Sequence, residues 1–445
     1  MDEHNWLQKE LRGAADGEIP AEADLAIAQG IQRAKALRRR NRTSLTAAAS
    51  FFLLVTVFAA LIHVSPAFAS AIRQIPGMEI FVRILSTQDK GLARAFDNEF
   101  FQPVNISRTQ NGETVTLNGI IADESRIVVF YSWGNAPTAP KHGPEVKLRP
   151  ADGSQLPAVI GFQHSPVPAE PVSSGSDYMD AMLAEGTPMP DDFIFEARLA
   201  GDDGPVMQIP FKLDRELFMN RVETIPIGKS VVIQGQTVTF NEAKLYPTRV
   251  LLDVSFKESN TKQLFGLRDI HLVTEKGERL SSKGASHVSE NKKTLIFEST
   301  YFTRPKELYV EGSLVTALDK VQLTVTLDPQ NKQILSPDNR LQLLKLTDLG
   351  DSYAVSLKLS GLDSSWDNMG YMTGSGAWKD AHGNTVEVSN RTSSRTLGED
   401  SESNASLESF TIPKKDNGGV LTTTLQEWPN PLREPYRIRI KYRHL

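Results

Sequence analysis

The stretch Asn111–Asn118 reads NGETVTLN, and Gln234–Asn241, which begins 123 residues later, reads QGQTVTFN. The match continues without a gap, because Arg126–Trp133 (RIVVFYSW) aligns with Arg249–Phe256 (RVLLDVSF) at the same offset. Each copy has a turn that contains glycine, followed by apolar residues that alternate with polar ones, as in a β-hairpin. We therefore interpret the two copies as one repeated β-unit, and this repeat predicts the fold of most of the chain.

Further segments extend the repeat toward the C-terminus. Three more pairs match in the same order: Val146–Leu156 with His271–Leu280, Phe193–Leu199 with Leu295–Tyr301, and Met207–Asp214 with Val321–Asp328. The last pair is expected to supply the strand that closes each unit. The stretch Ser165–Pro190, rich in Pro, Ser and Gly, is expected to be an exposed insertion in the first unit.

A third, more divergent copy is expected to follow. Its strands are predicted at Tyr353–Ser360, at the hairpin Ala377–Val386 and at the closing strand Tyr436–Tyr442. Units of this length, built from alternating strands and Gly/Asn/Asp turns, predict β-sandwiches of immunoglobulin-like architecture. Five aromatic residues at alternating strand positions are expected to pack in the cores: Trp133, Phe193, Phe256, Phe297 and Trp378.

An apolar segment lies upstream of the repeat. Thr43–Ile72 has no formally charged residue, and its centre Ala47–Val64 has about the length that a helix needs to cross a bilayer. The basic residues Arg38, Arg39, Arg40 and Arg42 precede it, which places the N-terminus in the cytoplasm. The alternative is a cleaved signal peptide, since Ala67 and Ala69 fit a small-x-small cleavage site. The long preceding segment and the long apolar run favour a retained anchor, with Ala67 and Ala69 as candidate positions for proteolysis.

Residues 1–43 carry short apolar stripes with roughly helical spacing, interrupted at Gly17–Pro20. A tail this short cannot bury a core of its own, so its apolar side chains are candidates for binding a cytoplasmic partner. These candidates are Trp6, Leu7, Leu11, Leu25, Ile27 and Ile31. The alternative is a weakly structured tail that only sets the membrane topology, and the residues leave both interpretations open.

Composition excludes several kinds of site. The chain has 445 residues and no cysteine, so it can form neither disulfides nor a thiolate metal site. Residues 44–445 carry 41 basic and 47 acidic residues, and this mildly acidic part argues against nucleic acid as a direct partner. The chain has no Gly-x-Ser-x-Gly elbow, no Walker loop and no His-Glu motif. We therefore expect no enzymatic activity, no catalytic or metal-binding residues and no cofactor.

Short motifs after the apolar segment resemble a known family. Ser65–Ala69 (SPAFA), Ile75–Gly77 (IPG), Asp89–Leu92 (DKGL) and the strand pair Gly112–Trp133 occur in an order that is similar to domain of unknown function family 4179. The next unit, from Ile225 to about Asp328, resembles the immunoglobulin-like domain family 5643 that commonly accompanies it. As an ordered set the motifs are moderately specific, and together they cover roughly residues 45–330.

The resemblance implies a topology and a partner. Members of the first family are single-pass membrane proteins of Gram-positive bacteria, and many are described as anti-sigma factors. The resemblance thus implies a retained anchor and a sigma factor as the cytoplasmic partner. This chain departs from zinc-type anti-sigma factors, because a chain without cysteine lacks their His–Cys site. Its tail is also shorter than a full sigma-wrapping domain, so a short helical clamp would have to make the contact.

Together these observations predict a mainly β protein with an N-terminal helical tail and one transmembrane helix. The expected boundaries are 1–43 for the cytoplasmic tail, 44–66 for the transmembrane helix, and 67–220, 221–330 and 331–445 for tandem immunoglobulin-like β-sandwiches outside the membrane. The predicted function is that of a cell-membrane anti-sigma factor or sensor, which detects an unknown envelope ligand for an extracytoplasmic-function sigma system. The alternative is an envelope-binding or structural β-sandwich protein, anchored or secreted, without a signalling role.

Overall fold

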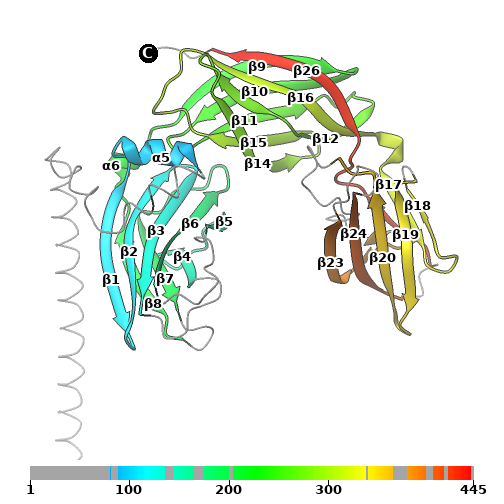
Figure 1. Ribbon diagram of the computed structural model, residues 1–445, viewed down its shortest axis with the longest axis horizontal. Coiled ribbons are helices and arrows are strands. Elements are labelled where there is room, and N and C mark those ends of the chain that lie inside the picture. The colour runs from blue at the N-terminus through cyan, green and yellow to red at the C-terminus, as the bar shows by residue number, and fades with distance from the viewer. Residues whose placement is uncertain are drawn as a thin grey trace, which may run out of the picture. The chain divides into compact units, whose positions relative to one another are not determined.

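The computed structural model in Figure 1 describes residues 81, 89–135, 144–163, 174–199, 204–336, 339–363, 378–396, 404–414 and 419–441. These residues belong to one compact unit, Gly77–Leu445, and they are mainly β, as expected. None of the helices among them is long and apolar enough to cross a membrane. The predicted tail, residues 1–43, and the predicted transmembrane helix, residues 44–66, lie outside the described residues.

The first β-sandwich follows a short helix, α5 (Lys90–Asp97). One antiparallel sheet has the order β1-β2-β3-β6-β5, and the other has the order β4-β7-β8. The strands are β1 (Gln102–Gln110), β2 (Glu113–Asp123), β3 (Arg126–Gly134), β4 (Glu145–Pro150), β5 (Ala158–Gln163), β6 (Gly175–Leu183), β7 (Asp192–Arg198) and β8 (Met207–Lys212). The rings of Tyr131 on β3 and Phe195 on β7 are 5.3 Å apart, so the two sheets face each other across an aromatic core.

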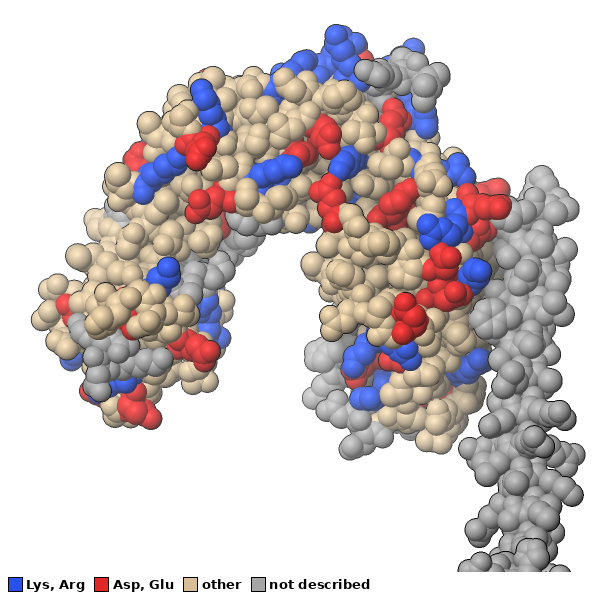
Figure 2. All heavy atoms as spheres, turned by 180° about the vertical axis from the view of Figure 1, so that it is seen from behind, with Lys and Arg blue, Asp and Glu red and all other residues tan. Residues whose placement is uncertain are grey.

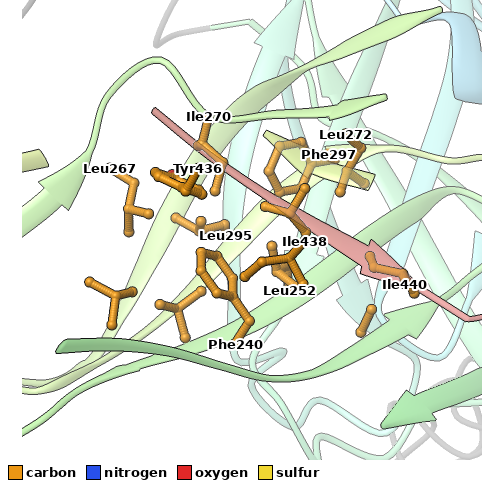
Figure 3. Close-up of a cluster of buried hydrophobic side chains, with 14 of the residues drawn as sticks. Phe240, Leu252, Leu267, Ile270, Leu272, Leu295, Phe297, Tyr436, Ile438 and Ile440 are labelled. Carbon is orange, nitrogen blue, oxygen red and sulfur yellow. The ribbon is translucent and has the colours of Figure 1, made fainter. Parts of the chain in front are cut away.

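The second β-sandwich begins after the short helix α6 (Arg215–Phe218). Its first sheet has the order β9-β10-β11-β15-β14, and β14 continues into the second sheet, in which β13 pairs with β16. The strands are β9 (Glu223–Ile233), β10 (Gln236–Leu245), β11 (Arg249–Phe256), β12 (Lys262–Leu267), β13 (His271–Thr274), β14 (Arg279–Ser289), β15 (Lys292–Glu298) and β16 (Leu308–Asp319). Buried residues from both sheets form one core cluster, drawn in Figure 3.

The hairpins at the start of the two sandwiches are equivalent in detail. Their two-residue turns both have positive φ, at Asn111–Gly112 and at Gln234–Gly235, which suits the twist of a tight hairpin. The register shifts after Leu117 in one copy and after Phe240 in the other, 123 residues apart. One hydroxyl pair also recurs at this offset, Ser107 with Thr116 and Ser230 with Thr239, each 2.8 Å apart. This part of the predicted repeat is confirmed.

The last strand, β26 (Pro431–Ile440), closes the second sandwich and not the third. It pairs antiparallel with β16, from Leu308 opposite Ile440 to Thr316 opposite Pro431. Four of its side chains are buried in the second core: Leu432, Tyr436, Ile438 and Ile440 (Figure 3). The prediction that Tyr436–Tyr442 closes the third unit is therefore wrong. The alternating pattern correctly predicts a strand with one buried face, but it does not identify the sheet that covers this face.

The third sandwich is inserted between β16 and β26. Its sheets have the orders β18-β17-β25-β21-β22 and β19-β20-β24-β23, preceded by the 3-10 helix η1 (Lys320–Gln322). The strands are β17 (Thr324–Asp328), β18 (Gln333–Leu335), β19 (Leu341–Asp348), β20 (Ser352–Ser360), β21 (Trp378–Lys379), β22 (Thr385–Val386), β23 (Ser389–Thr396), β24 (Ala405–Pro413) and β25 (Leu421–Thr424). The third sandwich is thus an insertion into the second and not a third tandem unit.

Two further strand assignments differ from the sequence prediction. Val321–Asp328 was expected to close the second unit, but its strand β17 pairs with β18 and β25, and Val325 and Leu327 are buried in the third core. Phe193–Leu199 was matched to Leu295–Tyr301, yet the strand that is equivalent to β15 in its pairing is β6, which lies beside β3. Strand β6 falls within Ser165–Pro190, so this stretch is not simply an exposed insertion.

Replacing Ile438 by Ala tests where β26 belongs. Ile438 is 3% exposed in the second core, so the change is expected to lower the free energy of unfolding by about 2–5 kcal/mol. Hydrogen exchange should accelerate in β16, the strand beside β26. The control is Leu335→Ala on an edge strand, where the side chain is 67% exposed and a change within about 0.5 kcal/mol is expected. Faster exchange in β20 and β24 with β16 unaffected would contradict the assignment.

Candidate functional site

The residues that the sequence suggests for partner binding, topology and proteolysis all lie outside the described part of the chain. They are Trp6, Leu7, Leu11, Leu25, Ile27, Ile31, Arg38, Arg39, Arg40, Arg42, Ala67 and Ala69. The described chain begins to be continuous at Asp89, immediately before α5. The candidate site considered below is therefore the junction at which α5 meets the first and second sandwiches.

Helix α5 is fixed at its N-terminus by Asp89. The Asp89 Oδ1 atom accepts a hydrogen bond from the Leu92 amide over 3.0 Å, so Asp89 is the N-cap. The buried face of the helix carries Gly91, Leu92, Ala95 and Phe96, at the spacing of an amphipathic helix. The sequence DKGL thus combines a cap, a small residue and the first apolar anchor.

The helix also contacts the second sandwich. A Cβ atom on Gly91 would lie 2.5 Å from the amide nitrogen of Ser299, so only glycine permits this close approach. Arg94 of α5 forms an ion pair with Glu278. Just after the helix, the ring of Phe100 lies 5.5 Å from that of Phe302. Residues of α5 and its C-terminal end therefore pack on both sandwiches.

Arg126, the first residue of β3, is the central charge of the junction. Its Nε and Nη2 atoms donate to the two oxygens of Asp180 over 2.7 and 2.6 Å, and its Nη1 atom donates to Asp89 Oδ2 over 3.0 Å. Burial opposes the charge, but the two carboxylates outweigh it and raise the pKa of Arg126 above its ordinary value. One guanidinium thus joins the cap of α5 to strand β6 of the first sandwich.

Asp123, at the end of β2, connects the first sandwich to the second. Its Oδ1 atom accepts from the Ser125 amide and hydroxyl over 2.9 and 2.6 Å. Its Oδ2 atom accepts from the Thr248 amide and hydroxyl, also over 2.9 and 2.6 Å. Asp123 and Thr248 are both 0% exposed. This buried carboxylate therefore holds the turn before β3 against the turn before β11.

Arg249 begins β11, as Arg126 begins β3, 123 residues earlier. Its Nε atom donates to the Ser125 hydroxyl over 2.9 Å, and burial lowers its pKa, with Asp123 acting in the opposite direction. The equivalent arginines of the two repeats thus meet in one buried cluster, together with Asp89, Asp123 and Asp180.

The geometry of the cluster suits a fixed mechanical joint. Both oxygens of Asp89, of Asp123 and of Asp180 accept hydrogen bonds from protein groups. Among the described residues, no group of three or more His, Asp or Glu side chains is placed to hold a metal ion. Arg126 of the first sandwich donates both to Asp89, the cap of α5, and to the Thr248 carbonyl oxygen of the second sandwich, so α5 is linked to both sandwiches through one guanidinium.

Sequence reasoning did not identify this junction. The available signal was the recurrence of Arg126 and Arg249 at the repeat offset, because each places a charge at the start of a strand whose next three residues are apolar. Asp180 could not be found in this way, because it lies in β6, within the stretch that was interpreted as an insertion.

Comparison with known proteins identifies two families along the chain. Residues 37–133 match the family described as a domain of unknown function (DUF4179), and residues 222–347 match the family of unknown function DUF5643. Both resemblances drawn from the sequence are confirmed. The first match includes α5 and strands β1 to β3, and the second extends from just before β9 into the third sandwich.

Similar solved structures are remote. A conserved domain protein from Bacillus anthracis is 14% identical with a TM-score of 0.35, over 53% of this chain and 84% of that one. The 217–571 segment of TarS from S. aureus is 11% identical with a TM-score of 0.14, over 54% of this chain and 81% of that one. With such scores neither likeness defines the fold. No curated protein matches the chain.

Replacing Arg126 by Met tests the central charge. Met keeps most of the side-chain volume but leaves the buried Asp89 and the partly buried Asp180 without their cation, so the free energy of unfolding is expected to fall by about 3–5 kcal/mol. The control is Arg215→Met, whose ion pair with Asp191 is about half exposed and is worth at most about 1 kcal/mol. Urea unfolding measures both, and equal losses in the two variants would contradict the role of the cluster.

Replacing Asp123 by Asn tests the connection between the sandwiches. Whichever way the amide is turned, its NH₂ group faces two donors, so a loss of about 1–3 kcal/mol is expected. Whichever amide the NH₂ group faces, that of Ser125 or that of Thr248, should then exchange its hydrogen faster. The matched control is Asp152→Asn in an exposed turn, where the carboxylate accepts from the Ser154 amide. Unchanged protection of both the Ser125 and the Thr248 amide would show that the carboxylate does not hold the junction.

Proposed function

We propose that this chain, which carries segments of families DUF4179 and DUF5643, is a single-pass membrane regulator that acts as an anti-sigma factor. In this proposal residues 44–66 cross the membrane, residues 1–43 bind a sigma factor in the cytoplasm, and the β-sandwiches detect an envelope signal outside. The chain acts by binding and release, with no catalytic step of its own. The family matches support the proposal, because the first of them begins at residue 37 and spans the predicted membrane segment.

The single observation that carries the mechanism is the attachment of α5. The predicted transmembrane helix ends at residue 66 and α5 begins at Lys90, so α5 is the first described helix that follows the membrane segment. Asp89 caps this helix and binds Arg126, in a cluster to which both outer sandwiches contribute. A change in the outer sandwiches would thus reach α5, which follows the predicted membrane segment in the chain.

The cytoplasmic contact is assigned to the apolar side chains of the tail. Trp6, Leu7 and Leu11 precede the break at Gly17–Pro20, and Leu25, Ile27 and Ile31 follow it. A short amphipathic helix binds by placing its apolar face in a groove of the partner, so large side chains at these positions would provide most of the affinity.

Affinity purification of the full-length protein through an N-terminal tag tests the assignment. Membranes that contain the wild-type protein should yield a co-purified sigma factor, and the double variant Trp6→Ala with Leu11→Ala should lose it and derepress the sigma-dependent promoter. The matched control is Leu335→Ala with Leu344→Ala, which removes two exposed apolar side chains of the third sandwich and should change neither result.

The opposite result would favour a different class of protein. If a fragment that begins near residue 70 appears in the medium, and no regulator co-purifies with the tail, the anti-sigma proposal fails. The chain would then be an envelope-binding or structural β-sandwich protein.

A further inference from the structure

The outer face of the second sandwich carries a group of arginines near its C-terminal strand. Strand pairing places Arg439 of β26 beside Tyr309 of β16, Tyr309 beside Val273 of β13, and Val273 beside Arg279 of β14. In the next row Arg437 lies opposite Glu311. The side chains of these positions point away from the core that holds Val310, Ile438 and Ile440, because successive residues of a strand face opposite sides of the sheet.

The acids of this face lie deeper than the arginines. Side-chain exposure is 58% for Arg437, 56% for Arg279 and 49% for Arg439, but 21% for Glu311 and 32% for Glu307. Glu311 forms ion pairs with two arginines: its Oε1 atom lies 3.2 Å from Arg437 Nη1, and its Oε2 atom lies 3.6 Å from Arg279 Nη1. Glu311 and Glu307 therefore hold the three arginines in place from below, and the guanidinium groups lie further out than these two carboxylates. A third acid, the exposed Glu275, lies beside Glu307, where its Oε2 atom accepts from the Glu307 amide over 3.3 Å.

Aromatic stacking orders this layer further. The guanidinium carbon of Arg437 lies 3.9 Å from the centroid of the Tyr309 ring. A stacked guanidinium keeps its N–H groups in one plane at its edges; Arg437 directs Nη1 to Glu311, and its other N–H groups can form hydrogen bonds with an oxyanion. Lys229 of β9 adds a further cation near this edge, since its ammonium donates to the carbonyl oxygen of Arg439 over 3.2 Å. Figure 2 shows basic side chains gathered along the top of this sandwich, where β9 and β26 lie.

The spacing favours a polymer over a single ion. The Cα positions of Arg439 and Arg279 are three strand spacings apart, about 14 Å, and those of Arg437 and Arg439 are about 6.7 Å apart along one strand. The guanidinium groups of Arg437 and Arg279 meet at Glu311, whereas that of Arg439 pairs with Glu307, four residues earlier in the chain, so one phosphate group is too small to contact all three. Residues 44–445 carry a net negative charge, so the whole molecule would not attract a polyanion. Any attraction would have to come from this local face.

We propose that this face, defined by Arg279, Arg437 and Arg439, binds a linear phosphodiester polymer. Each guanidinium would hold one phosphate group through paired hydrogen bonds, and successive phosphates of the polymer would lie across strands β26, β16, β13 and β14. The proposal concerns a binding surface outside the α5 junction and does not depend on a sigma factor.

Binding of the full-length protein to poly(glycerol phosphate) at several salt concentrations tests this proposal. With three phosphate contacts, the logarithm of the affinity should fall with the logarithm of the salt concentration with a slope of about −2. The double variant R437Q/R439Q should bind about tenfold more weakly, with a slope of about −0.7. The variant R437K/R439K keeps both charges but cannot form paired hydrogen bonds or the stack on Tyr309, so it should bind more weakly than wild type while it keeps the salt slope of about −2. The control R149Q/R215Q removes two partly exposed arginines of the first sandwich and should leave binding unchanged.

Three results would overturn the proposal. One is the absence of binding at low salt, and another is equal binding by wild type and R437Q/R439Q. The third is a preference for phosphatidylglycerol vesicles or for polyglutamate over poly(glycerol phosphate), which would identify a lipid surface or a carboxylate polymer as the occupant. Thermal unfolding of each variant verifies that it is folded. The variants are expected to stay folded, because an exposed ion pair of this kind changes the folding equilibrium by at most about fivefold.

Discussion

A guanidinium group that is removed from water needs carboxylates around it, and Arg126 has two, Asp89 and Asp180. These two carboxylates belong to different elements, the cap of α5 and strand β6. Because Arg126 pairs with both carboxylates, it fixes the position of α5 relative to β6. Asp123 imposes the same kind of constraint on the second sandwich, because four donors from the two turns converge on one fully buried carboxylate. Neither group can be released without leaving an unpaired charge, and this cost opposes separation of the elements.

The inserted third sandwich imposes a second constraint. Strand β26 completes the core of the second sandwich, but in the sequence it comes after all the strands of the third sandwich. The second core is therefore complete only when a segment that follows the third sandwich has joined it. The return segment is held from both sides: Glu427 pairs with Arg268, Asn430 exchanges hydrogen bonds with Ala317, and Trp428 is buried in the third core. Phe265 and Leu318 also belong to the third core although they lie on strands of the second sandwich. The second and third sandwiches therefore share buried residues as well as a covalent connection.

The sequence predicts local features of this fold better than it predicts which segments pair across it. The hairpins at Asn111–Gly112 and Gln234–Gly235 were correctly predicted, because turn residues and alternation within about 20 residues define them. All five aromatic residues expected in cores are buried, for the same reason. The partner of β26 was assigned wrongly, since alternation in PYRIRI specifies a buried face but not the strand beside it. Strand β6 was not predicted, because Pro, Ser and Gly are frequent in the residues around it. Asp180 lies on this strand and was missed for the same reason, and its contact with Arg126 joins residues that are 54 positions apart in the sequence.

If the junction holds, α5 and the first two sandwiches move as one body, and hydrogen exchange of the unmodified full-length protein measures whether they do. The Leu92 amide is bound by Asp89, and the Thr248 amide is bound by Asp123. If the junction is stiff, both amides exchange as slowly as those of the buried strand β3, because they open only when the surrounding structure does. Fast exchange at Leu92 or Thr248, while β3 stays protected, would mean that α5 or the second sandwich detaches freely, and the account would be contradicted.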